Sequence, residues 1–399
     1  MRVGLICRTL HGIDTNSTLL QLAEALSTYN VECDIFTTVD AMKIQQRPTH
    51  FASFFVVVGG QLQPVVVTEQ HRETVRIFSI AATETVPFAA TVAGIMGKLL
   101  AREEKIDLLH LTNAEDVCAT LLCQQYYRTP FVYSVRERVE IKQVKHEFTG
   151  LHLHFPAEQF IVGDFVLNQQ LAASKASYLL DETGDSRLWN SFFCTYAGKY
   201  VESIPSINTS YWATQAAEGS RLMRKQEFLQ EQGCAHKIVV ACEQKRYLSA
   251  ELEPDFLLIA MGNLTREERR KLLQCADYYV AEEGPPDKLL AAMAAGSIPI
   301  APRKGFATQL IHDEALQATQ STGYLYQEED WVATLQRAKV DMETRPEWQQ
   351  ALRQRATMRI RDHYSMQAVT PLYDRVYRGF APVRLPFITE GEQPPAPLV

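Results

Sequence analysis

Short apolar segments alternate with stretches of helical periodicity along almost the whole chain. Val75–Ile80 and Phe131–Val135 are examples of the apolar segments, and Leu19–Leu26 and Arg266–Cys275 are examples of the helical ones. Consecutive parallel strands need a crossover between them, so this alternation is typical of parallel sheets covered by helices on both faces. We therefore predict an α/β fold built from doubly wound sheets.

The first half of the chain carries one series of predicted strands. They are Val3–Cys7, Glu32–Thr37, Val75–Ile80, Leu108–Leu111, Phe131–Val135, Tyr178–Leu180 and Val201–Ile204. Phe54–Val58 and Val65–Val67 are separated by a Gly-Gly turn, which indicates an inserted hairpin. We expect helices between most of the other strands.

A second series of strands follows a segment without periodicity, Pro205–Thr214, which is rich in Pro, Ser, Asn and Thr. Its members are Ile238–Cys242, Phe256–Met261, Tyr278–Ala281 and Ile298–Ala301. A chain of 399 residues exceeds the roughly 250 to 300 residues that one core organises, so the segment is a predicted domain boundary. After Glu328 an almost continuous helix is predicted to about Arg378, and the tail from Pro382 contains five prolines.

Charge and composition exclude several classes of protein. Hydrophobic residues make up 46% and charged residues 22%, close to the averages of folded globular proteins. The net charge is −7 with no long basic run, so nucleic acid is not expected as a partner. The most apolar window, Phe51–Val67, is interrupted by Gly, Gln and Pro, so any membrane contact is expected to be peripheral.

The N-terminus and the cysteines predict a cytoplasmic protein. The first residues, MRVGLICRTLHG, lack the apolar stretch and cleavage site of a signal peptide. The eight cysteines are scattered without the spacing of a zinc site, which indicates reduced thiols and no metal. His152 and His154 have no third ligand nearby, so a structural role is favoured for them.

Pro286–Arg303, which reads PDKLLAAMAAGSIPIAPR, resembles the signature helix and strand of family 4 glycosyltransferases of the GT-B fold. The matching residues are Ala292, Met293, Ala294, Gly296 and Pro299. Weaker similarities occur in the family's order up to about residue 380: His11–Ile13, Asp107–His110, Ile204–Thr209, Arg266–Val280, Gly323–Tyr326 and His363–Ser365. Small residues let such a helix pack closely on a sheet, and Gly296 is suited to end it.

This resemblance implies an architecture of two Rossmann-like doubly wound domains that face each other. Residues 1–205 would form the acceptor-side domain and residues 206–365 the donor domain. Residues 366–381 would form a helix that crosses back to the first domain, and residues 382–399 a proline-rich tail. The implied activity is transfer of a sugar from a nucleotide-diphosphate sugar with retention, as in cell-surface polysaccharide biosynthesis. The acceptor would be a carbohydrate, a lipid-linked molecule or a protein, and no cofactor is implied.

The resemblance also supplies candidate residues. The helix start near Pro286, with Lys288 and Leu289, would hold the diphosphate through backbone N–H groups and the helix dipole. Glu283 matches the first carboxylate of the family's Glu-x7-Glu pair, which contacts the donor sugar, although a solvated loop carboxylate is an equal alternative. The other candidates for donor binding are Gly12, Gly262 and Asn263.

Several residues depart from the family pattern. Ala291 stands where the second carboxylate of the pair binds the ribose, and Arg136 stands where a catalytic His is usual. Arg cannot accept a proton near neutral pH, but its guanidinium group can bind phosphate. Lys245 and Arg246 are either substitutes for the family's diphosphate-binding cation pair or ordinary solvated charges. Gln309 replaces a frequent Glu.

Two other functions remain open from the sequence. The departures at Arg136 and Ala291 fit a degenerate homologue that binds or scaffolds a protein partner in a glycosylation complex. An NAD-dependent oxidoreductase would share the sheet architecture, but it needs G-x-G-x-x-G after the first strand. Ile6–Ile13 contains a single glycine, so this function is disfavoured.

Overall fold

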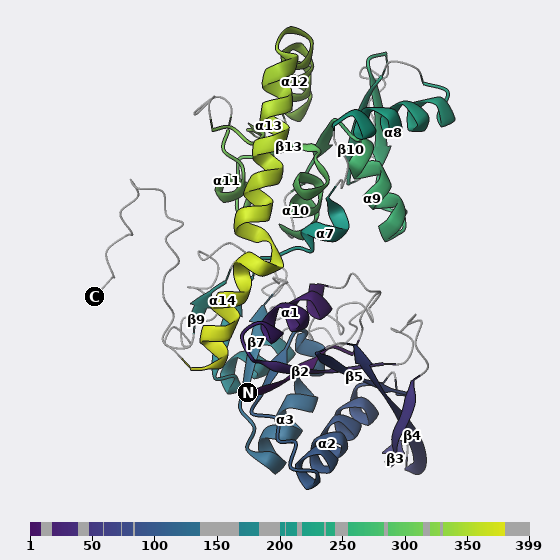
Figure 1. Cartoon of the computed structure of the whole chain (residues 1–399), viewed down its shortest axis with the longest axis vertical. Coiled ribbons are helices and arrows are strands. Elements are labelled where there is room, and N and C mark those ends of the chain that lie inside the picture. The colour runs from purple at the N-terminus through teal and green to yellow at the C-terminus, as the bar shows by residue number, and fades with distance from the viewer. Residues whose placement is uncertain are drawn as a thin grey trace, which may run out of the picture.

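The structure is a computed structural model with two α/β domains, each built on its own sheet (Figure 1). It describes residues 1–8, 18–38, 48–58, 60–72, 74–82, 84–135, 167–182, 200–203, 205–213, 218–234, 237–243, 254–282, 286–313, 320–327 and 330–379. None of the helices within these ranges combines the length and apolar character needed to cross a bilayer. The predicted fold class is confirmed.

The first domain contains a nine-stranded sheet with the order β3-β4-β5-β2-β1-β6-β7-β8-β9. Its strands are β1 (Arg2–Ile6), β2 (Glu32–Thr38), β3 (Thr49–Val58), β4 (Gln61–Arg72), β5 (Val75–Ile80), β6 (Leu108–Leu111), β7 (Phe131–Val135), β8 (Tyr178–Asp181) and β9 (Tyr200–Glu202). From β5 to β9 all pairs are parallel, whereas β3 and β4 form an antiparallel hairpin. The predicted hairpin is therefore confirmed, and its strands are longer than predicted.

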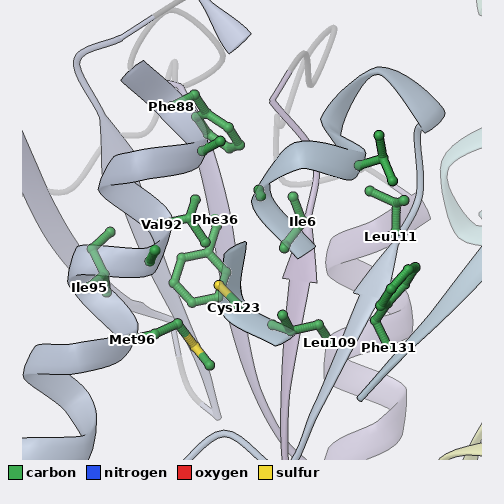
Figure 2. Close-up of a cluster of buried hydrophobic side chains, with 14 of the residues drawn as sticks. Ile6, Phe36, Phe88, Val92, Ile95, Met96, Leu109, Leu111, Cys123 and Phe131 are labelled. Atoms are coloured by element: carbon green, nitrogen blue, oxygen red, sulfur yellow. The ribbon is translucent and has the colours of Figure 1, made fainter. Parts of the chain in front are cut away.

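Both faces of the first sheet are covered, because successive side chains of its strands point to opposite sides. One face packs on α2 (Thr85–Ala101) and α3 (Val117–Tyr127), as Figure 2 shows for Phe36, Phe88 and Phe131. The other face packs on α1 (Thr18–Ser27) and on α14 (Met366–Tyr377). Each face of the sheet therefore has its own hydrophobic core, and alternate residues of one strand belong to different cores. In β2, for example, Phe36 belongs to the core on the α2 and α3 side, and Ile35 to the core on the α1 and α14 side.

The second domain contains a five-stranded parallel sheet with the order β11-β10-β12-β13-β14. Its strands are β10 (Ile238–Cys242), β11 (Phe256–Ala260), β12 (Tyr278–Val280), β13 (Ile298–Pro302) and β14 (Tyr324–Tyr326). Its helices are α7 (Thr209–Trp212), α8 (Glu218–Glu231), α9 (Arg266–Cys275), α10 (Pro286–Ala295), α11 (Ala307–Leu310), α12 (Trp331–Thr344) and α13 (Pro346–Arg359). The predicted boundary at residue 205 falls between the two sheets, and its position stays a prediction.

The end of α10 confirms the role predicted for Gly296. This glycine has a φ of +91°, which side-chain-bearing residues rarely adopt. The Gly296 N–H donates to the Met293 carbonyl at 3.1 Å, and the Ser297 N–H donates to the Ala292 carbonyl at 2.9 Å. These two bonds form a Schellman motif, which ends the helix and turns the chain into β13.

The C-terminal helix is less continuous than the sequence predicts. It breaks between Thr344 and Pro346, since proline lacks the N–H that would continue the first helix, and again at Ser365. A π-helical turn, Ile360–Tyr364, separates α13 from α14, and the Ser365 hydroxyl caps α14 by accepting from the Ala368 N–H. The segment predicted to lack periodicity also contains the short helix α7, which is capped by Asn208.

The chain passes between the domains twice, and the two passages lie side by side. The Ile207 N–H donates to the Tyr364 carbonyl at 2.9 Å, and Ile207 pairs with Ser365 as an isolated parallel bridge. Before this point α13 lies along the second domain, and after it α14 lies beside α1 on the first (Figure 1). The predicted crossing of the C-terminal helix back to the first domain is therefore confirmed.

Candidate functional site

The order of strands in the second sheet predicts where a ligand would bind. The chain places β11 on one side of β10 and all later strands on the other side, so the topological switch point lies between β10 and β12. In open parallel sheets, ligands bind beyond the carboxyl ends of the strands at such a point. The residues that follow Cys242 of β10 and Val280 of β12 are therefore the candidates for a ligand-binding site.

Glu243, the first residue after β10, connects three elements at this switch point. One of its carboxylate oxygens accepts a hydrogen bond of 2.6 Å from the Tyr279 hydroxyl of β12. The other lies 2.5 Å from the ammonium group of Lys288 in the first turn of α10. The side chain of Glu243 is only 11% exposed, so this ion pair is partly shielded from water. Lys288, predicted to bind the donor, is thus paired with a carboxylate of the same domain.

The start of α10 offers fewer N–H donors than helix starts usually do. The N–H groups of the first turn have no partner within the helix and are the groups that bind anions. Pro286 begins α10 and has no N–H, and Pro285, which precedes it in the sequence, has none either. Asp287 and Lys288 supply the N–H groups that remain.

An acidic side chain lies beside those remaining groups. Asp287 belongs to the first turn of α10, and desolvation raises the pKa of its carboxyl group. The neighbouring backbone N–H groups and the Lys288 ammonium group act in the opposite direction on this pKa. A diphosphate bound at the start of α10 would therefore lie close to an acidic side chain.

The described residues around the switch point are predominantly acidic. Burial raises the pKa of Tyr279 well above its usual value, and the carboxylates of Glu243, Asp287 and Glu282 raise it further. Burial likewise raises the pKa of the Cys242 thiol to about 12, again with a contribution from Glu243. Cys242 is therefore not a nucleophile at neutral pH.

Gly262, another predicted donor-binding residue, lies beside Glu243. A Cβ atom on Gly262 would be 3.6 Å from the Glu243 carbonyl oxygen, and the Met261 N–H donates to the Cys242 carbonyl at 2.8 Å. The loop that follows β11 is thereby held next to the end of β10. Gly262 and the neighbouring Asn263 are exposed, so the structure brings both to the edge of the sheet where Glu243 lies.

Leu289 and Ala291 belong to the core rather than to a polar surface. Both are buried in the cluster that packs α10 on the sheet. Leu289 can contribute to donor binding only through its backbone or by shape. At position 291 the buried methyl group offers no acceptor for ribose hydroxyls, in agreement with the substitution noted in the sequence.

The remaining predicted site residues lie outside the described residues. They are Gly12, Arg136, Lys245, Arg246 and Glu283. The strands that precede them are described, and each of these residues follows the carboxyl end of a parallel strand: β1, β7, β10 or β12.

Sequence reasoning missed a charged cluster at the switch point of the first sheet, between β1 and β6. Arg8 follows β1, and its backbone N–H donates to the Asp116 carboxylate at 2.9 Å, while its Nε lies 3.1 Å from the same group. The guanidinium group also donates to the Thr85 hydroxyl at 2.8 Å and pairs with Glu115 at 3.1 Å. Burial raises the pKa of Asp116 to about 6, although the contacts with Arg8 oppose this shift.

A second unpredicted cluster is a buried hydrogen-bond network between the first sheet and α14. His110 of β6 lies 2.7 Å from the Tyr377 hydroxyl through Nδ1 and 2.7 Å from the Ser134 hydroxyl through Nε2. The Ser134 and Tyr373 hydroxyls each donate to the Glu182 carboxylate at 2.6 Å. Because Ser134 donates to Glu182, its oxygen accepts from the Nε2–H of His110.

Solved structures with similar architecture cover nearly the whole of the chain. The catalytic domain of starch synthase IV from Arabidopsis thaliana, bound to ADP and acarbose, matches with a TM-score of 0.69 and 12% identity, over 95% of this chain and 98% of that one. HepE from Anabaena, in complex with UDP and glucose, matches with a TM-score of 0.59 and 12% identity, over 95% and 100%. The chain has the GT-B fold.

The glycosyltransferase WaaG, involved in lipopolysaccharide biosynthesis, also matches this GT-B chain, with a TM-score of 0.54, 12% identity and coverage of 94% and 100%. No protein-family model and no curated protein matches the sequence. At such identities the likeness shows the GT-B fold alone.

Proposed function

We propose that this chain transfers a sugar from a nucleotide-diphosphate sugar to an acceptor, with retention of anomeric configuration. The proposal rests mainly on α10 and β13, which follow the switch point of the second sheet at the place where open α/β sheets bind ligands. Two of the similar structures, those of starch synthase IV and HepE, were solved with ADP or UDP bound. The acceptor would be a carbohydrate, a lipid-linked molecule or a protein.

In this proposal the protein acts by positioning the donor and stabilising the departing diphosphate. Arg136, Lys245 and Arg246 would neutralise the phosphates, and Gly12 would allow the backbone to approach them. Glu283 would hold the sugar, and Gly262 and Asn263 would line the donor side. The scheme uses no metal or cofactor.

Isothermal titration with UDP, GDP and ADP is the first experiment. We expect binding of one nucleotide with a dissociation constant in the micromolar to millimolar range, because the ribose acceptor is absent and the first turn of α10 carries an acidic residue. The absence of a binding signal with all three nucleotides would contradict the proposal.

A specific observation favours a second function, that of a degenerate homologue which binds a protein partner. The Asp287 carboxyl group lies in the first turn of α10, and Lys288 is paired with Glu243, so the described part of the donor site disfavours a diphosphate. This function predicts no hydrolysis or transfer with any sugar nucleotide and a stable complex with a partner in pulldown. Turnover of a single sugar nucleotide would exclude it.

A further inference from the structure

The outer face of the β3–β4 hairpin is apolar and exposed. Phe55 pairs with Pro64 across the two strands, and Val57 pairs with Leu62. Phe55 is 67% exposed, Val57 61% and Leu62 64%, and Val66 on the same face is also exposed. Cross-strand partners lie on one side of a sheet, so these side chains form one continuous patch. We call these five residues the hairpin patch.

The opposite face of the hairpin is well packed, so the hairpin is a fixed element. Val56, Val65 and Val67 are buried in the first core. Phe54 lies so close to α2 that a Cβ atom on Gly94 would be 2.6 Å from its ring. The hairpin, whose strands β3 and β4 lie at one side of the first domain in Figure 1, is therefore held in a defined position.

The strand β3 is also an edge of the nine-stranded sheet, and no other strand of the described residues pairs with its outer side. Natural proteins protect long edge strands with charges, prolines or bulges. The sequence of β3, THFASFFVVV, contains no Lys, Arg, Asp, Glu or Pro, and its only irregularity lies at its start, between His50 and Ala52. An unprotected edge beside an apolar face indicates that another surface covers the hairpin.

We propose that the hairpin patch is the contact surface between two copies of this chain, related by a two-fold axis. In such an interface each residue faces the same surface on its partner, so a charged patch would repel itself. The hairpin patch has no charge, so it can face its own copy without repulsion. A lipid surface is a weaker fit, because peripheral membrane sites surround their apolar residues with Lys and Arg.

The size of the patch sets the strength of the association. A hairpin with strands of ten and twelve residues is roughly 30 to 40 Å long. Its outer face covers only a few hundred Å², below the ~800 Å² per partner of a stable interface. The dimer is therefore a weak one that forms and dissociates with concentration.

Analytical ultracentrifugation of the full chain over a range of concentrations tests the proposal. We expect a monomer–dimer equilibrium in the wild type, and about a tenfold or larger rise in dissociation constant in the double variant Phe55→Ser, Leu62→Gln. Met223→Gln is the matched control, since Met223 is 63% exposed on α8 of the other domain. Thermal unfolding checks that all variants are folded.

Three outcomes would overturn the proposal: a wild type that stays monomeric at the highest concentration, a dimer that survives the double substitution, and a dimer that Met223→Gln disrupts equally. Sedimentation with vesicles of anionic and neutral lipid forms a separate arm. Binding of a monomer to vesicles that is lost in the double variant would assign the patch to lipid instead. Nucleotide binding is measured in parallel, because it tests the proposed function and does not depend on the patch.

Discussion

At the residue scale, the start of α10 shows how a small number of side chains changes the properties of a shared fold. Two prolines remove N–H donors, and the Asp287 carboxyl group lies in the first turn beside those that remain. Lys288, which could attract a diphosphate, is paired with Glu243. The sequence identified the helix and its proline start, but it did not reveal these contacts, because Glu243 lies 45 residues away along the chain.

Removal of the Asp287 carboxylate is expected to strengthen nucleotide binding. In Asp287→Ala one acidic group is lost from the first turn of α10, which favours a bound anion by about 0.5 to 1.5 kcal/mol, or about two- to tenfold in affinity. Isothermal titration with the best-binding nucleoside diphosphate measures the change. Glu347→Ala, which removes an acidic residue from the first turn of α13, is the control. An unchanged or weaker affinity in Asp287→Ala would show that the diphosphate does not meet the start of α10.

The raised pKa of Asp116 predicts a dependence of stability on pH. A carboxyl group with a pKa near 6 in the folded state and about 4 when unfolded is protonated first in the folded state. Its contribution to stability is therefore complete below about pH 4 and is lost as the pH rises through 6, a change of ~2 to 3 kcal/mol. The difference in unfolding free energy between the wild type and Asp116→Asn, measured by urea unfolding from pH 4 to 7, should follow this course. A difference that stays constant over that range would show that Asp116 has an ordinary pKa.

At the element scale, the regular pattern of apolar segments was sufficient to predict most of the strands. Phe131–Val135 and Ile238–Cys242 have the limits predicted for them, since strands buried on both faces are continuous apolar runs. The helix Arg266–Cys275 was also predicted with its observed limits, and Thr265 and Glu268 form its capping box. The network around His110 was not predictable, because Tyr377 is 267 residues away and only the crossing of α14 brings them together.

Loss of one hydroxyl from this network should destabilise the first domain. In Tyr377→Phe the buried His110 loses its hydrogen bond with the Tyr377 hydroxyl, which costs ~1 to 3 kcal/mol. Urea unfolding at constant pH measures the effect. Tyr126→Phe is the control, because Tyr126 is exposed on α3. Equal stability of the two variants would mean that the network does not help to hold α14 in place.

At the scale of the whole molecule, the two domains are joined by two adjacent passages and by a helix that one half of the chain supplies to the other. The general arrangement of two doubly wound sheets follows from the alternation of strands and helices. The position of α14 does not, because its apolar face would also suit the second domain. The decisive contacts are those of Leu372 and Val376 with the core on the α1 side of the first sheet.

Truncation tests the contribution of α14 to the first domain. A chain that ends at Tyr364 loses six buried side chains from that core: Met366, Val369, Leu372, Tyr373, Val376 and Tyr377. Each buried apolar side chain contributes about 1.5 to 3 kcal/mol. The joint loss of these side chains is therefore comparable to the whole stability of a typical domain, ~5 to 15 kcal/mol. We expect limited proteolysis to degrade the first domain and to spare the second, whereas a chain that ends at Gly379 resists cleavage in both. Equal resistance of the two truncated chains would contradict this assignment.

The origin of α14 in the last part of the chain has a consequence for biosynthesis. A polypeptide emerges from the ribosome with its N-terminus first, and domains that are synthesised first usually fold first. Here the first sheet lacks one of its covering helices until residue 377 has left the exit tunnel, so its apolar surface stays open while the second domain is being translated. The nascent chain should therefore complete its two halves in reverse order and depend on chaperones for most of its synthesis.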